Sequence, residues 1–264
     1  MDILRKMKQG HLFFKEEGHK YTYKGKLVPI STTGFISKFK EPFDREFWLI
    51  KTSVKENIPV EILDKNWDYI AKYGTLRGSL THLSIEHYIE NNIFKYEVPK
   101  EIHKKDVQKF KASVDTCISH GKKFVEDYYF NGEYTLLAKE YTVGLIENDE
   151  CLLAGKIDNI SQDKEGKIFL FDYKTDKKFE KSSKYNKKFL APFEYLDDCE
   201  LSKHSLQLAI YKLLFEQQTG LTVEGCKIVW LNDANPSYQV VPVQTIPLTY
   251  DLLRNCIKST DSFR

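Results

Sequence analysis

Apolar and polar residues alternate with a period of two through the middle of the chain, which is typical of strands with one buried face. Three consecutive strands are predicted there, over residues 135–146, 151–161 and 167–173. Their connections carry the Asn, Asp and Gly residues that hairpin turns favour. The stretch from Ile168 to Phe171 is apolar throughout and predicts a strand buried on both faces. Two more strands are predicted over residues 222–231 and 238–243.

Helical spacing of apolar residues occupies most of the rest of the chain. Helices are predicted over residues 31–39, 43–57, 60–73, 74–93, 99–130, 202–219 and 250–259. We expect a bend at Gly121 in the longest of them, and a cap at Ser202 for the helix that Gly220 ends. Residues 11–30 alternate aromatic and polar side chains, which predicts a hairpin or small meander.

These elements predict an α/β fold in which a mixed central β-sheet is flanked by helices. We expect an aromatic-rich N-terminal β/α extension over residues 1–73 and the main core over residues 74–264. The total of 264 residues suits one large domain or one domain with such an extension.

Composition narrows the partners and cofactors. A net charge of +2 is too small to indicate a polyanionic partner, so any nucleic-acid surface must be a local patch. Five scattered cysteines form no C-x-x-C pair, which argues against a zinc ribbon or an iron–sulfur cluster and predicts reduced thiols in a cytoplasmic protein. No apolar run approaches the roughly 20 residues that span a bilayer, so we expect no membrane association. No G-x-x-x-x-G-K-[ST] motif indicates a nucleotide cofactor or a helicase motor.

Two acids at the ends of apolar strands carry the clearest chemistry. Asp158 closes the motif G-K-I-D, and Asp172 opens the motif D-Y-K-T one hairpin later. Two carboxylates brought together beside a buried strand repel each other, and a divalent cation such as Mg²⁺ or Mn²⁺ resolves the conflict. Lys174 lies two residues after Asp172, so both side chains share one face of the strand. The alternative from spacing alone is an ordinary Asp–Lys pair on an exposed edge strand.

Two helical pairs supply further polar groups. His82 and Glu86 are four residues apart on one predicted helix, and Gln207 and Tyr211 are four apart on another, so each pair shares a helix face. The plainer alternatives are a histidine bonded within its own helix and a Gln–Tyr pair satisfied inside the core.

The order G-x-x-x-H-x-x-x-E, G-x-I-D, D-Y-K-T and Q-x-x-x-Y resembles the RecB-like branch of the PD-(D/E)XK nuclease superfamily, over residues 74–211. That branch includes nuclease domains of bacterial recombination helicases, CRISPR-associated exonucleases and the mitochondrial genome maintenance exonuclease, and many phage exonucleases are similar. The resemblance implies a restriction-endonuclease-like core. Asp172 stands where a glutamate is more frequent, and the cysteines of the iron–sulfur members are missing, which argues against the CRISPR-associated type.

The resemblance also implies a set of site residues. His82, Asp158 and Asp172 would bind one or two Mg²⁺ or Mn²⁺ ions together with the main-chain carbonyl of Tyr173, and Lys174 would be the catalytic lysine. Three roles are added: Gln207 and Tyr211 contacting DNA or bracing the site, Glu140 as a strand glutamate near the metals, and Glu86 as an accessory.

A lysine-rich segment follows the acid–lysine strand. Its lysines, beginning with Lys177 and Lys178, alternate with aromatic residues, a combination that binds single strands through phosphate contacts and base stacking. The alternative is a solvated charged loop. The aromatic extension is likewise expected either to pack on the core or to form an arch or wedge over the DNA entrance.

The leading expectation is a DNA exonuclease that acts on single-stranded or free ends in replication, repair or recombination. A phage-encoded enzyme acting in the host cytoplasm, with a replication or recombination partner protein, fits the same reading. Two alternatives stay open: a structure-specific or restriction-type endonuclease, and a non-catalytic DNA-binding module on a nuclease fold.

Overall fold

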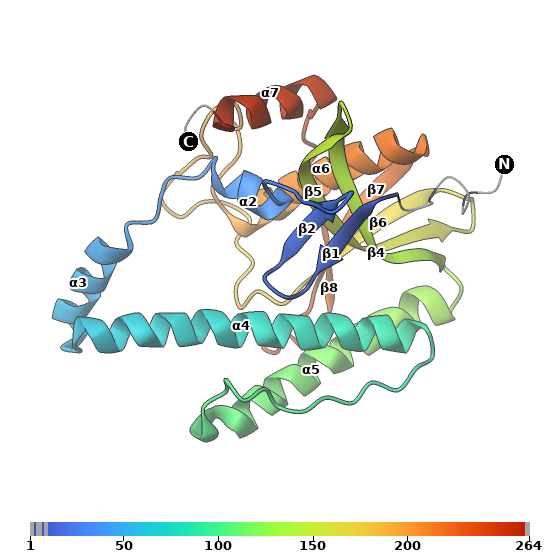
Figure 1. The fold of residues 1–264 in the computed structure, drawn as a ribbon. Helices are drawn as coiled ribbons and strands as arrows, with labels where there is room; N and C mark the ends of the chain where they lie inside the picture. The colour runs from blue at the N-terminus through green and yellow to red at the C-terminus, as the bar shows by residue number, and fades with distance from the viewer. Residues whose placement is uncertain (1–2, 4–6, 8–9, 262–264) are drawn as a thin grey trace.

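A computed structural model describes residues 3, 7 and 10–261 of the chain (Figure 1). Its strands are β1 Leu12–Lys15, β2 Lys20–Tyr23, β3 Lys26–Leu27, β4 Tyr134–Glu147, β5 Glu150–Asp163, β6 Ile168–Lys174, β7 Val223–Trp230 and β8 Gln239–Pro242. Its α-helices are α2 Thr32–Ser37, α3 Arg45–Glu56, α4 Val60–Ile89, α5 Val107–Val125, α6 Glu200–Thr219 and α7 Tyr250–Asp261. A 3₁₀ turn, η1 Lys104–Asp106, precedes α5, and a π-helical turn, η2 Glu126–Phe130, follows it.

The strands form a small antiparallel sheet, β1-β2-β3, and a five-stranded sheet in the order β4-β5-β6-β7-β8. Neighbouring strands of the larger sheet are antiparallel except β6 and β7, which are parallel because α6 connects them. The predicted class, a mixed α/β fold with a mixed central sheet and flanking helices, is confirmed.

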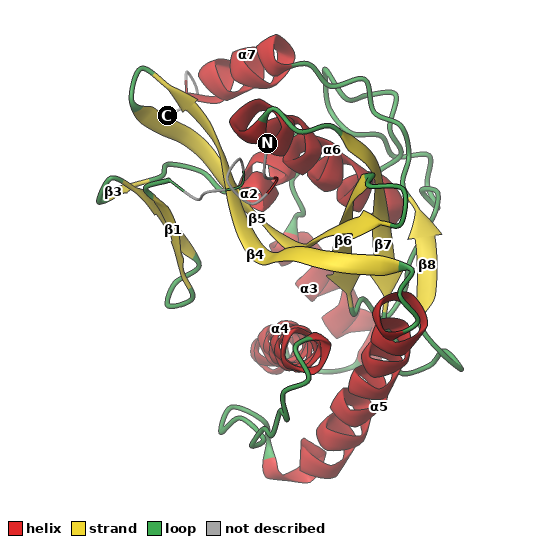
Figure 2. Ribbon diagram, turned by 90° about the vertical axis from the view of Figure 1, so that its right-hand side faces the viewer, coloured by secondary structure: helices red, strands yellow, loops and turns green. Residues whose placement is uncertain are grey.

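Strand β6 lies at the centre of the sheet and is buried on both faces, as its unbroken apolar run predicts. Leu170 belongs to the core cluster beneath α6, whereas Phe171 and Tyr173 belong to the cluster that includes Phe124 of α5 and Ile85 of α4. Figure 2 shows the sheet between these two helical layers.

The two central strands separate partway along their length. The ladder between β5 and β6 ends at the pair Asn159–Phe171, after which β5 continues with β4 alone and β6 continues with β7 alone. In Figure 2 the outer half of the β4–β5 hairpin bends away from β6 towards α7. The next residues beyond the last pair are Asp158 on β5 and Asp172 on β6.

The N-terminal segment packs onto the outer half of β5. The amide of Ala154 donates to the carbonyl of Ile30 at 3.1 Å, and the hydroxyl of Thr32 donates to the carbonyl of Ala154 at 3.2 Å. Leu12 of β1 accepts a hydrogen bond from the Thr142 hydroxyl of β4 at 3.1 Å. The predicted meander over residues 11–30 is confirmed.

Three helical predictions are wrong in detail. Residues 60–89 form one helix rather than two, so the boundary predicted at 73/74 falls inside α4. The helix expected from Pro99 begins only at Val107 and runs through Gly121, where the absence of a side chain admits Ile85 of α4. Helix α6 begins at Glu200, so Ser202 is a buried residue of its first turn rather than its cap.

The five cysteines are unpaired thiols in the structure. None of the helices in the described part of the chain is both long and apolar enough to cross a membrane.

Candidate active site

Asp158 and Asp172 lie where β5 and β6 separate. The Asp158 carboxylate accepts a hydrogen bond from the Tyr173 amide at 2.8 Å, and so takes the place that a carbonyl of β5 would occupy if the ladder continued. In a strand, the amide and carbonyl of one residue point to the same side. The Tyr173 carbonyl therefore faces the gap between the two strands, on the side of Asp158.

The carbonyl of the next residue points the other way. It accepts from the Leu231 amide at 2.7 Å, which ties the end of β6 to the chain beyond β7. The backbone at the predicted catalytic lysine is thus hydrogen-bonded on its β7 side.

Asp172 and Lys174 form a buried ion pair. Their charged groups lie 2.5 Å apart, and the side chains are 3% and 16% exposed. Burial raises the pKa of Asp172, and the neighbouring Asp158 raises it further, while Lys174 opposes both. Burial lowers the pKa of Lys174, but the attraction of Asp172 and Asp158 outweighs it and leaves that pKa raised, so the ammonium keeps its proton. These burial values and the central place of β6 exclude the alternative of an exposed edge-strand pair.

Helix α4 brings His82 to the acids. The His82 Nδ1 atom lies 3.6 Å from a carboxylate oxygen of Asp158, and its ring meets the Tyr173 ring edge-on at 5.6 Å. Glu86, one turn further along, is half-buried in the same region, where burial raises its pKa to about 7 and Asp158 acts in the same direction.

Gln207 and Tyr211 satisfy each other inside the core, which was the plainer of the two sequence alternatives. The Gln207 amide donates to the Tyr211 hydroxyl at 2.8 Å, and both residues are buried. A methyl group on Gly155 would lie 2.3 Å from the Tyr211 ring, so this ring rests directly on the backbone three residues before Asp158. The pair therefore packs against the strand that carries the acid.

Glu140 lies on β4 at the level of Asp158, between the paired residues Lys139–Asn159 and Tyr141–Ile157. Its φ of +51° is left-handed, which is uncommon for a residue with a side chain and marks a local kink in the strand. The Glu140 carboxylate forms an ion pair with Lys156, whose ammonium also lies 4.3 Å from the centre of the Phe14 ring.

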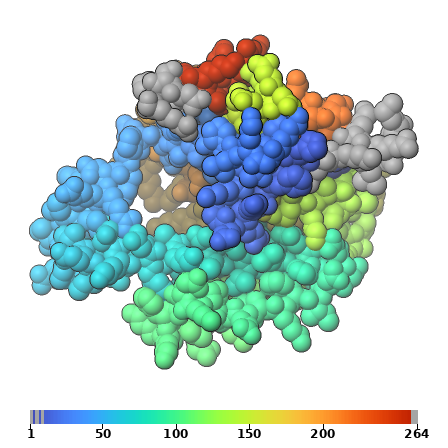
Figure 3. Space-filling view, viewed as in Figure 1, coloured from blue at the N-terminus to red at the C-terminus, as the bar shows by residue number. Residues whose placement is uncertain are grey.

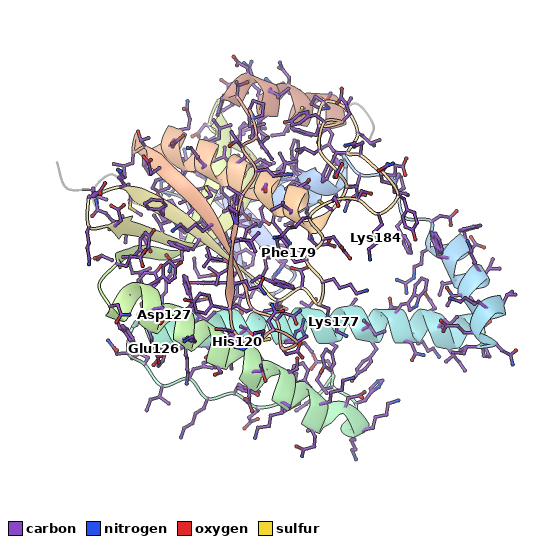
Figure 4. The ribbon with its side chains drawn as sticks, turned by 180° about the vertical axis from the view of Figure 1, so that it is seen from behind. His120, Glu126, Asp127, Lys177, Phe179 and Lys184 are labelled. Carbon is purple, nitrogen blue, oxygen red and sulfur yellow. The ribbon has the colours of Figure 1, made fainter. Side chains whose placement is uncertain are left out.

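The segment of residues 175–199 runs from the end of β6 to α6. Figure 4 shows Lys177 near α4 and Lys184 further out, towards α3. The Phe179 ring packs on His204 of α6 and Trp230 of β7, with ring centres 5.8 and 5.5 Å apart. Lys177 and Lys178 are exposed, and the ammonium of Lys177 lies 5.9 Å from the Tyr73 ring. Three other lysines already have acidic partners: Lys184 with Glu180, Lys187 with Glu41, and Lys188 with Asp197.

The donor groups at the separation of the strands fit a divalent cation. One oxygen of Asp172 is fully buried without a hydrogen bond, although the Lys174 ammonium is close to it. Among the described residues, no three His, Cys, Asp or Glu side chains gather closely enough to hold a metal by themselves. The Tyr173 carbonyl would therefore complete a set with Asp158 and Asp172, and such hard oxygen donors suit Mg²⁺ or Mn²⁺.

Three residues at this centre escaped the sequence analysis. Arg77, in the motif G-T-L-R-G that opens the stretch around His82, donates to the Thr175 carbonyl beside Lys174. His204 of α6 is buried, 3.4 Å from the carboxylate of Asp176. Tyr21 of β2 lies near the acids, where burial together with Tyr211 and Asp158 raises its pKa. Of these three residues, only Arg77 had a signal in the sequence, because it is the one basic residue in a motif otherwise made of small and apolar residues.

The comparisons with known proteins give one family and one distant structure. A sequence model of the PD-(D/E)XK nuclease superfamily matches residues 68–244, more than half of the chain. A comparison with curated proteins finds no match. Among solved structures, the crystal structure of SSO0001 aligns with 14% identity over 70% of this chain and 84% of that one, at a TM-score of 0.33, which is too low to support an argument. The residues that the family model matches include Asp158, Asp172 and Lys174, and the family agrees with the mixed sheet that carries them. The chain belongs to the PD-(D/E)XK nuclease superfamily.

Proposed function

We propose that this protein is a divalent-metal-dependent DNA exonuclease that degrades single strands from a free end. Membership of the superfamily suggests phosphodiester hydrolysis, and its members typically use divalent metal ions. The observation that carries the proposal is the pair of buried acids with Lys174 at the point where β5 and β6 separate. A bound ion would polarise the scissile phosphate and lower the pKa of an attacking water.

The protein groups have separate roles in this proposal. Asp158, Asp172 and the Tyr173 carbonyl hold the ion, with His82 as a further ligand. The Lys174 ammonium, which keeps its proton, orients the attacking water and offsets negative charge that develops on the phosphate. Gln207 and Tyr211 keep β5 in place from the α6 side.

An opening through the molecule supports the requirement for a free end. Figure 3 shows the molecule open between the α3–α4 corner and the core behind it. The chain from Phe39 to α4 frames one side of the opening, and residues 175–190 frame the other. The two sides join at both ends: Arg77 donates to the Thr175 carbonyl, and the Leu190 amide donates to the Phe39 carbonyl at 2.7 Å. An ion pair between Lys187 and Glu41 adds to the second junction at 2.9 Å. A strand within such a closed frame has entered by its end.

Aromatic and basic side chains near the opening support a single-stranded substrate. Phe47 and Trp48 of α3 are 52% and 42% exposed, and the Lys51 ammonium lies 5.6 and 4.8 Å from their ring centres. A cavity of about 550 Å³ beside them is lined in part by Phe43, Trp48 and Lys187. Stacking on aromatic rings and phosphate contacts to lysine are how proteins bind single strands without reading sequence.

The catalytic assignment is tested with end-labelled linear single-stranded DNA and Mg²⁺. We expect short products from the wild-type protein, and a rate loss of at least about 10²-fold for Asp172→Asn and for Lys174→Ala, as for loss of a preorganised electrostatic group. Asp149→Asn, an exposed change on the turn between β4 and β5, is the matched control and should keep wild-type activity. Undiminished cleavage by both active-site variants would refute the assignment.

Whether the protein is an exonuclease or an endonuclease is tested with the same single-stranded DNA closed into a circle. If DNA must enter by a free end, the circular form should survive while the linear form is digested. Cleavage of the circle at the linear rate would instead identify an endonuclease. Binding of both forms without any cleavage under Mg²⁺ or Mn²⁺ would favour a non-catalytic DNA-binding module.

A further inference from the structure

Three successive carbonyl groups after the acid–lysine pair each accept a hydrogen bond from a different source. The Lys174 carbonyl accepts from the Leu231 amide at 2.7 Å. The next carbonyl, of Thr175, accepts from the Arg77 guanidinium. The Asp176 carbonyl accepts from the Trp230 indole and the Asn232 amide, both at 2.7 Å. Arg77 is the member of this group that comes from α4, the helix that also carries His82.

The Arg77 guanidinium is buried among three acceptors: the Thr175 carbonyl, the Ser113 hydroxyl and the Asp233 carboxylate. Its side chain is 3% exposed, and it lies 3.4 Å from Asp233 and 3.3 Å from the Ser113 hydroxyl, which itself donates to Asp233. A guanidinium cannot lose its proton to escape burial, so its desolvation cost is offset only by Asp233 and the hydrogen-bond acceptors around it. Its planar, forked donors suit three acceptors at fixed angles better than a lysine would.

Helix α4 also touches the catalytic strand directly beside Arg77. A methyl group on Gly78 would lie 3.2 Å from the Thr175 hydroxyl, so the helix backbone approaches the residue after Lys174 closely. A little more than one turn later the same helix places His82 Nδ1 at 3.6 Å from Asp158. One rigid helix therefore contacts both the β6 side and the β5 side of the gap.

We propose that Arg77 is a positioning residue that fixes α4 against the end of β6, and thereby holds His82 beside Asp158, where the two can serve the same metal ion. The inference rests on the proposed metal site. Arg77 itself need not touch the ion or the substrate. Its loss should let α4 shift relative to the sheet, so that the metal is held less tightly while the chemistry at Lys174 stays available.

The direct test measures Mn²⁺ binding by electron paramagnetic resonance on the full chain without DNA. We expect Arg77→Met to weaken Mn²⁺ affinity by about tenfold or more, as loss of groups that orient metal ligands does. Arg77→Lys should fall between Arg77→Met and the wild type, because a lysine keeps one charged hydrogen bond and loses the fork. Raising Mg²⁺ should restore most of the cleavage rate of Arg77→Met, a rescue that a general packing defect would not show.

Arg254→Met is the matched control. The guanidinium of Arg254 pairs with Glu147 at 2.9 Å, on α7, at the opposite end of the molecule from α4. Its removal should leave Mn²⁺ affinity unchanged. If Arg77→Met fails to fold in a thermal melt, the comparison is made between Arg77→Lys and the wild type, with a weakening of a few-fold expected.

Two failures are distinguishable. A wild-type protein that binds no Mn²⁺ and cleaves no DNA refutes the proposed function itself. A wild-type protein that binds Mn²⁺ and cleaves, alongside folded Arg77 variants with wild-type affinity, overturns only the role of Arg77.

Discussion

Glu86 illustrates how surroundings set the chemistry of a single carboxyl group beside this site. Burial accounts for most of the rise in its pKa to about 7, and Asp158 adds to it, while Lys139 and Lys156 oppose it. The sequence supplied only its place four residues after His82. Its ionisation depends on residues that are more than 50 positions away along the chain.

The raised pKa predicts a pH dependence of stability. The folded protein holds the Glu86 proton more tightly than the unfolded chain, so this contribution is fully present below about pH 4.5 and is lost as the pH rises towards 7. Without divalent ions, the free energy of unfolding should therefore fall more between pH 5 and 7.5 for the wild type than for Glu86→Gln. Urea unfolding at the two pH values measures this difference, with Glu101→Gln, an exposed change, as control. Identical pH dependence in wild type and Glu86→Gln would contradict the prediction.

At the scale of elements, the acid-bearing half of β5 is fixed by contacts that a side chain would obstruct. A methyl group on Gly155 would lie 2.3 Å from the Tyr211 ring of α6 and 2.6 Å from the Thr32 hydroxyl of α2. Helix α2 and helix α6, which are far apart in the sequence, thus both contact β5 at this one glycine. The motif G-K-I-D therefore contains a glycine needed for close packing as well as the acid that we propose binds the metal ion.

Gly155→Ala should destabilise the protein by about 1–3 kcal/mol, the usual cost of overpacking a core, and should lower activity because β5 carries Asp158. Gly74→Ala on α4 is the matched control. Nothing lies within 4 Å of the added methyl group there, so the change should stabilise the helix by up to about 1 kcal/mol. Urea unfolding midpoints test both variants, and equal stability of the two would show that the contact at Gly155 yields easily.

The bounds of some helices and strands could be predicted from the local sequence pattern, and those of others could not. The five strands of the main sheet were predicted almost to their ends, because alternation and turn residues are local signals. Helix α4 was predicted as two helices because Gly74 and Gly78 weaken the local helical signal. The structure continues the helix through both glycines, since its packing on α5 and on Thr175 stabilises it.

At the scale of the whole molecule, the N-terminal segment packs on the outer half of the main sheet and also extends away from it. Residues 39–57 and the first half of α4 extend from the core and frame the opening, while the hairpin β1–β2 lies against β4 and β5 (Figures 1 and 3). The aromatic residues of the extension divide between two environments: Phe35 and Phe39 are buried, which agrees with packing on the core, whereas Phe43, Phe47 and Trp48 are exposed. An arch or wedge over the DNA entrance stays a prediction.

Covalent closure of this frame tests how DNA enters. Glu41→Cys and Lys187→Cys replace an exposed ion pair, and a short bis-methanethiosulfonate reagent can join the two thiols through reducible disulfides, with methanesulfinate as the leaving group at each. We expect the crosslinked protein to digest linear single strands at close to its uncrosslinked rate, because an end can still pass through the frame. The same sample after reduction is the control. Activity that disappears on crosslinking and returns on reduction would show that DNA enters sideways through a separating frame.

The sequence by itself determined the succession of strands along the chain, the acid–lysine spacing on β6 and the shared helix face of Gln207 and Tyr211, because each follows from local periodicity. Only the tertiary structure decided that β5 and β6 separate at Asp158, that Arg77 reaches Thr175, and that Phe39 joins Leu190 to close a frame. The last two contacts join residues about 100 or more positions apart in the sequence, and the separation of the strands depends on what packs against each of them. Their geometry is fixed by how the layers pack, and no local pattern in the chain records it.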